Sequence, residues 1–110
     1  MRLRSLLFAL SLATWCGGAA SQAQDIPAEL WDRPRAASDI AAQDTIKRAV
    51  LATLAQPEAQ LVIHHANAQE PLLQAEELRS WLAALAVDPR RIVLRSDLAA
   101  GSPLRIEVIP

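Results

Sequence analysis

The sequence predicts an α/β (α+β) fold, a two-layer sandwich in which helices cover one face of a small mixed sheet. An apolar run at residues 61–63 (LVI), an amphipathic stretch at 71–88 and a second apolar run at 91–95 (RIVLR) give the order strand, helix, strand. Such a βαβ unit joins parallel strands through a right-handed crossover. A helix before this unit and a C-terminal edge strand after it complete the predicted fold.

Two helices are predicted from apolar residues at helical spacing. The first covers about residues 43–56, where Ile46, Val50 and Leu54 share one face and Pro57 ends the helix. The second begins near Pro71, because the first helical turn tolerates the missing N–H of proline. It ends before residue 89, since a residue that precedes proline avoids the helical conformation. Its predicted buried stripe is Ala75, Leu78, Trp81, Leu82 and Leu85.

The strands differ in how their apolar residues are arranged. Residues 61–63 are all apolar, which is typical of a central strand covered on both faces. Residues 91–95 have the same character. Residues 104–109 (LRIEVI) instead alternate apolar with charged side chains, which predicts a half-exposed strand. We expect this last strand at the edge of the sheet, where its unpaired backbone groups are open to a partner strand.

Residues 1–23 have the order of a secretory signal peptide: Arg2 and Arg4, then an apolar stretch at 6–13, then small residues. We expect cleavage after Ala23, with Ala20 as the alternative position. Cys16 leaves with this segment, so no disulfide is expected in the mature protein. We therefore expect a periplasmic protein, with residues 24–42 as an irregular N-terminal arm and 43–110 as one small domain.

The charge of the mature chain excludes one class of partner. Removal of residues 1–23 takes away two arginines and leaves nine basic and twelve acidic residues, a net charge of −3. Phosphate binding needs a net basic face, so no nucleic-acid partner is predicted. No other segment is long and apolar enough to cross a membrane, so no membrane span is expected in the mature chain.

Polar side chains gather where the two parallel strands end. His64, His65 and Asn67 follow the first of these strands, and Arg95 and Asp97 end the second. The carboxyl ends of parallel strands meet at one rim, where ligands bind. Neighbouring strand residues point to opposite faces, so the two imidazoles cannot easily chelate one metal ion. Ser96 is the only hydroxyl nearby, and no nucleophile-elbow pattern surrounds it.

Two segments resemble the C-terminal OmpA-like domain, the peptidoglycan-associating module of Gram-negative envelope proteins. AEELRSWLAALAVDPRRIVL (residues 75–94) is similar to the second helix and following strand of that family. LVIHHAN (residues 61–67) is similar to its first strand and Gly-His-Thr-Asp end. The resemblance implies the same fold and an envelope location. The family's ligand-binding aspartate and arginine correspond to Asn67 and Gln74, so both charges are absent here and charge-assisted contacts with a zwitterionic ligand are lost.

The sequence thus predicts a non-enzymatic, periplasmic envelope protein that acts through contacts with a protein partner, without a cofactor or metal. Trp31 in the arm and the strand at 104–109 are the predicted partner surfaces. One alternative is weak peptidoglycan binding, and a second is a small metal-binding or hydrolytic site at His64 and His65. The candidate ligand-binding residues are His65, Asn67, Gln74, Arg95 and Asp97.

Overall fold

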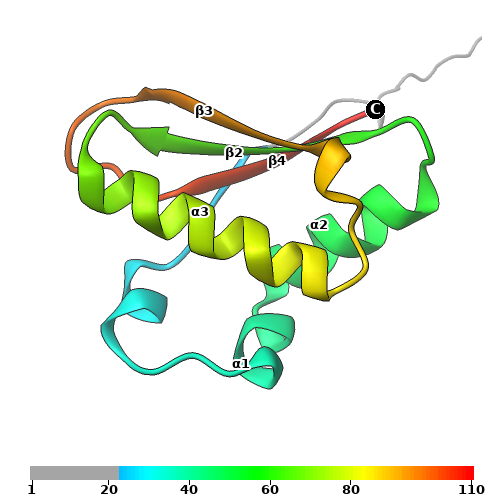
Figure 1. Cartoon of the computed structure of the whole chain (residues 1–110), viewed down its shortest axis with the longest axis horizontal. Helices are drawn as coiled ribbons and strands as arrows, with labels where there is room; N and C mark the ends of the chain where they lie inside the picture. The colour runs from blue at the N-terminus through cyan, green and yellow to red at the C-terminus, as the bar shows by residue number, and fades with distance from the viewer. Residues whose placement is uncertain (1–22) are drawn as a thin grey trace, which may run out of the picture.

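The computed structural model describes residues 23–110, which form a four-stranded sheet with the helices packed on one of its faces (Figure 1). The predicted α/β fold is confirmed. The signal-peptide prediction falls almost entirely on residues 1–22, outside this part. In chain order the elements are β1 (Gln24–Asp25), the 3₁₀ helix η1 (Ala28–Asp32), α1 (Ala37–Ala42), α2 (Asp44–Ala55), β2 (Gln60–Ala66), α3 (Gln69–Ala84), the 3₁₀ helix η2 (Pro89–Arg91), β3 (Ile92–Leu98) and β4 (Arg105–Ile109).

The strand order in the sheet is β1-β4-β2-β3. β2 and β3 are parallel, and α3 connects them, so the predicted βαβ unit is confirmed. In the register of this pair, Ile63 lies beside Leu94. On its other side β2 pairs antiparallel with β4, where Ile63 lies beside Ile106. β2 is therefore the central strand that its uninterrupted apolar run predicted.

The prediction that residues 104–109 form an edge strand is wrong. β4 lies between β2 and β1, because the chain at Gln24 and Asp25 folds back as a short strand beside it. Asp25 also accepts a hydrogen bond from Arg105 at 2.9 Å. The alternation within β4 reflects the two-layer architecture, in which one sheet face meets the helices and the other does not. The edge strand next to β2 is β3.

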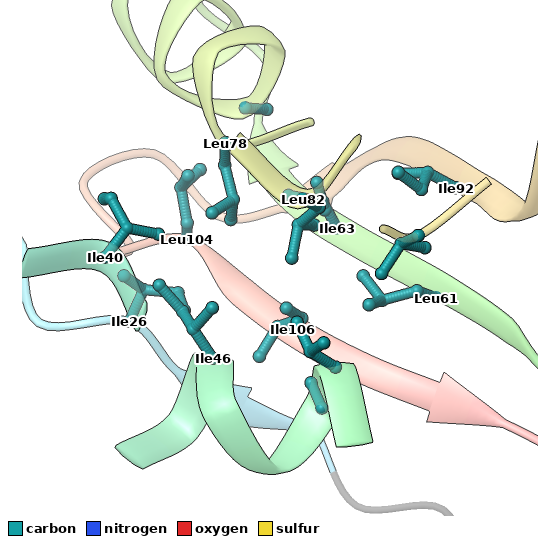
Figure 2. Close-up of a cluster of buried hydrophobic side chains, with 14 of the residues drawn as sticks. Ile26, Ile40, Ile46, Leu61, Ile63, Leu78, Leu82, Ile92, Leu104 and Ile106 are labelled. Carbon is teal, nitrogen blue, oxygen red and sulfur yellow. The ribbon is translucent and has the colours of Figure 1, made fainter. Parts of the chain in front are cut away.

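The hydrophobic core lies between the sheet and the helices, and both layers contribute side chains to it (Figure 2). Fully burying one of these aliphatic side chains stabilises the fold by about 1.5–3 kcal/mol. Trp81 and Leu85, which the sequence placed on the buried stripe of α3, are only partly buried against this cluster. The best-covered members are Ile26, Ile40, Ile46, Leu61, Ile63, Leu78, Leu82, Leu104 and Ile106.

Residues 24–42, predicted as an irregular arm, contain β1, η1 and α1. The arm contributes the buried Leu30 to the core, and Trp31 packs partly buried against it. The Arg35 guanidinium lies over the Trp31 ring, 5.2 Å from its centroid, and also binds Glu77 of α3. The arm is therefore part of the domain and is fixed to α3.

No helix in residues 23–110 is long and apolar enough to cross a membrane.

The Arg35–Glu77 pair makes the attachment of the arm sensitive to pH. The Glu77 carboxylate accepts hydrogen bonds from Arg35, one of them at 2.9 Å, and from the Trp81 indole at 3.0 Å. The hydrogen bond from Arg35 lowers the pKa of Glu77 in the folded protein. The stability that this pair adds is therefore fully present above the pKa that Glu77 has in the unfolded chain. It is lost as the pH falls through the pKa that Glu77 has in the folded protein.

We expect Glu77→Gln to lower the free energy of unfolding at neutral pH by up to about 1 kcal/mol, because the pair is partly solvent-exposed. The difference from wild type should disappear in acid. Urea denaturation at neutral and acidic pH measures both values. Glu76→Gln is the matched control, since among residues 23–110 this neighbouring carboxylate makes only a 3.9 Å contact with Arg79. An equal effect of Glu77→Gln at every pH would contradict the assignment.

Candidate functional site

The structure places the predicted site residues in three different locations. Arg95 and Asp97 lie on the sheet face that points away from the helices, together with His64. His65 and Asn67 line a hollow between α3 and the edge strand β3. Gln74 lines a second hollow, beside the arm. The single rim predicted from the sequence is therefore divided, because neighbouring residues of β2 face opposite sides of the sheet.

His64 connects three strands across the face without helices. Its Nδ1 lies 2.9 and 3.0 Å from the two carboxylate oxygens of Asp97 in β3. Its Nε2 lies 2.8 Å from Oε1 of Glu107 in β4. A carboxylate only accepts hydrogen bonds, so both contacts are complete when both ring nitrogens carry protons. Only 8% of the residue is exposed, and its side chain links β2 to both neighbouring strands, β3 and β4.

This geometry is unsuited to metal binding. The carboxylates of Asp97 and Glu107 lie at opposite edges of the imidazole ring, so they do not converge on one position. Each ring nitrogen, which would be the metal ligand, already faces a carboxylate. Within residues 23–110, no group of three or more histidine, cysteine, aspartate or glutamate side chains is placed to hold a metal ion.

Ser96, the hydroxyl expected near the two imidazoles, shares a face of the sheet with only one of them, His65. Ser96 lines the hollow with His65 and so lies on the face opposite to His64. Its hydroxyl makes no hydrogen bond to either imidazole in the described part of the chain. Activation of a serine requires a base within hydrogen-bond reach. The observed arrangement does not assemble such a pair.

The hollow beside β3 combines an apolar wall with a polar end. We call it the β3–α3 groove. Because α3 connects two parallel strands, it runs antiparallel to β3. Its first residues therefore lie near the end of β3, and its later turns lie near the beginning of β3. The polar end therefore lies at the start of α3. The groove is lined by Leu72, Ile92, Val93 and Leu94, by the polar side chains His65, Asn67, Gln69 and Ser96, by Ala68, and by Glu76 and Arg79 on the helix.

His65 forms the floor of the polar end, and only 5% of the residue is exposed. Its Nδ1 lies 2.9 Å from the carbonyl oxygen of Ala66. A carbonyl cannot donate, so Nδ1 carries the proton in this contact and Nε2 of the neutral ring is an acceptor. Within residues 23–110 no hydrogen bond reaches Nε2. His65 therefore presents an unused acceptor at the floor of the groove.

The second hollow lies between the arm and the first half of α3. Trp31 and Gln74 line it, together with the acidic side chains of Asp25, Asp32 and Glu70. The Trp31 indole N–H is buried and has no hydrogen-bond partner in the described part of the chain. Gln74 and Asn67, which the predicted OmpA-like resemblance places at the ligand pair of that family, line different hollows.

Sequence reasoning did not identify Glu107 or Leu72. The alternation in residues 104–109 placed Glu107 on the exposed face of a strand, but only the strand order brings it to His64. Leu72 lies outside the buried stripe of its helix and is 40% exposed. A leucine outside the buried stripe of an amphipathic helix is the sequence feature that could have indicated an apolar surface here.

Comparison with known proteins found no matching family model, no matching curated protein and no matching solved structure. The similarity to the OmpA-like domain therefore stays a prediction that depends on the residues quoted above.

Proposed function

We propose that this protein is a non-catalytic binding domain of the cell envelope, which holds an extended segment of a partner protein along β3. One observation carries the proposal. β3 is a seven-residue edge strand that pairs only with β2 among residues 23–110, and the β3–α3 groove lies directly beside it.

The backbone of an edge strand binds an extended chain through main-chain hydrogen bonds, while neighbouring pockets select its alternate side chains. The first half of β3 is regular, with residues 92–95 in continuous register with β2. One extra residue then enters β3 before Leu98, and this bulge interrupts the pairing. An added strand would therefore begin its pairing along the regular half, with side chains on the helix side entering the groove over Ile92 and Leu94. Its next side chain on that face would lie beside Ser96, at the start of the bulge.

We propose that the domain has no catalytic activity and that it lies in the cell envelope. The contacts of His64 with Asp97 and Glu107 support a structural role for that imidazole. The predicted signal peptide and the OmpA-like resemblance support an envelope location. Strand addition is one of the two partner-binding modes expected from the sequence. We assign it to β3 in place of residues 104–109, because β4 is flanked on both sides.

A selection of short unstructured peptides on the immobilised full chain tests the proposal. We expect the selected peptides to protect backbone amides of β3 from hydrogen exchange. Leu72→Asp should weaken their binding at least about tenfold, since a carboxylate then replaces the apolar wall. Leu73→Asp is the matched control, because Leu73 is 58% exposed and does not line the groove.

Two results would contradict this function. One is a set of peptides that bind tightly but protect no amide of β3. The other is equal weakening by Leu72→Asp and Leu73→Asp. Circular dichroism of both variants is the control that checks whether each of them is folded.

A further inference from the structure

We infer that His65 selects the bound segment by requiring a long side chain that ends in an N–H donor, glutamine or lysine, at the position opposite Ser96. This inference depends on the proposed function and specifies the chemistry of the partner. The juxtaposition that carries it is a buried imidazole acceptor at the floor of the groove beside an open edge strand.

The first step is the state of the His65 ring. The carbonyl of Ala66 fixes the proton of the neutral ring on Nδ1, which leaves Nε2 as an acceptor. The residue is 5% exposed, yet Nε2 is not among the fully buried atoms without a partner. Because His65 lines the groove, a donor that enters there supplies the hydrogen bond to Nε2 that the described residues do not.

The second step is the route from the edge of the sheet to this nitrogen. Arg95 lies beside His64 in the parallel register, so Ser96 follows on the face of His65. Both residues line the groove. Because serine is small, it leaves open the space between the outer edge of β3 and the imidazole. A bulkier residue at this position would close the route.

The third step is the length of the side chain. Neighbouring strands lie about 4.8 Å apart, so a strand added to β3 has its backbone about 10 Å from that of β2. The side chains of serine and threonine end close to their own backbone, whereas those of glutamine and lysine extend over β3 toward the groove that the His65 ring lines. A glutamate has the length of glutamine but only acceptor atoms, and it would place a carboxylate against the lone pair of Nε2.

The test uses the peptide with the strongest β3 protection, synthesised in four versions that differ only opposite Ser96: glutamine, lysine, glutamate and leucine. We expect glutamine or lysine to bind the full chain at least about tenfold more tightly than the glutamate version. His65→Phe keeps an aromatic ring but removes the acceptor, and it should abolish this preference. The four peptides on wild type decide the inference if that variant does not fold.

The outcomes separate this inference from the proposed function. If all four peptides protect β3 and bind alike, the role of His65 is wrong and the edge-strand function stands. If none protects β3, the function itself is wrong. If β3 amides are protected without peptide, and size-exclusion chromatography with light scattering gives a concentration-dependent dimer, a second copy occupies the edge and the peptide assignment is overturned.

Discussion

Leu82→Ala is expected to lower the free energy of unfolding by about 2–5 kcal/mol. Leu82 is fully buried and belongs to the same cluster as Ile63 (Figure 2). The substitution removes apolar contacts and leaves a cavity between α3 and the sheet. Domains of this size are stable by only about 5–15 kcal/mol, so a large share of the total is lost. Urea denaturation of the variant and the wild type measures the difference.

Leu73→Ala is the control for this prediction, because the same residue type lies on the same helix but is 58% exposed. It should change the stability by less than about 0.5 kcal/mol. Trp81→Ala should cost less than the loss of a fully buried indole, since Trp81 is only partly buried and its N–H donates to Glu77. Equal effects at Leu82 and Leu73 would mean that the buried face of α3 is misassigned.

Arg91→Ala is expected to lower the free energy of unfolding by about 2–3 kcal/mol, because one guanidinium binds three backbone carbonyls. Its Nε donates to Ala59 at 2.9 Å, and its Nη2 donates to Thr53 at 2.6 Å and also to Gln56. The last carbonyls of a helix have no partner within the helix, and a cation there also complements the helix dipole. Arg91 thus caps α2 and fixes the loop that leads into β2.

Arg91→Lys should recover only part of this loss, since an ammonium lacks the fork that reaches several carbonyls together. Arg90→Ala is the matched control. The neighbouring Arg90 side chain is 90% exposed, and in the described part of the chain it pairs with Asp88, so its loss should cost much less than the loss of Arg91. Hydrogen exchange at the end of α2 and urea denaturation measure the effect. Similar costs at positions 90 and 91 would contradict the cap.

The elements with strong local patterns were predictable. The apolar spacing around Ile46 and Val50 gave α2 within one residue at each end, and the two apolar runs gave β2 and β3. The end of α3 was not predictable in the same way. The helix stops at Ala84, and Ala86 then takes the left-handed conformation with φ 81°, which usually requires glycine. Here Val87 is almost fully buried, and its N–H donates to the carbonyl of Leu82.

The candidate site was predictable only as a set of residue types. His64, His65 and Asn67 were identified because they follow an apolar run, but their surroundings come from distant parts of the chain. Asp97 is 33 residues from His64 and Glu107 is 43 residues away. The two-residue β1, which covers β4 and leaves β3 as the longer edge strand, has too little sequence to carry a pattern.

By itself, the sequence determined which segments are helices and strands and which of their faces are apolar. This is because such patterns repeat every two to four residues and depend on near neighbours. The tertiary structure alone decided the strand order, the groups that each imidazole meets on its own face of the sheet, and the identity of the open edge. These features depend on backbone hydrogen bonds between distant segments, and such bonds form with any side chain and so leave little trace in the sequence.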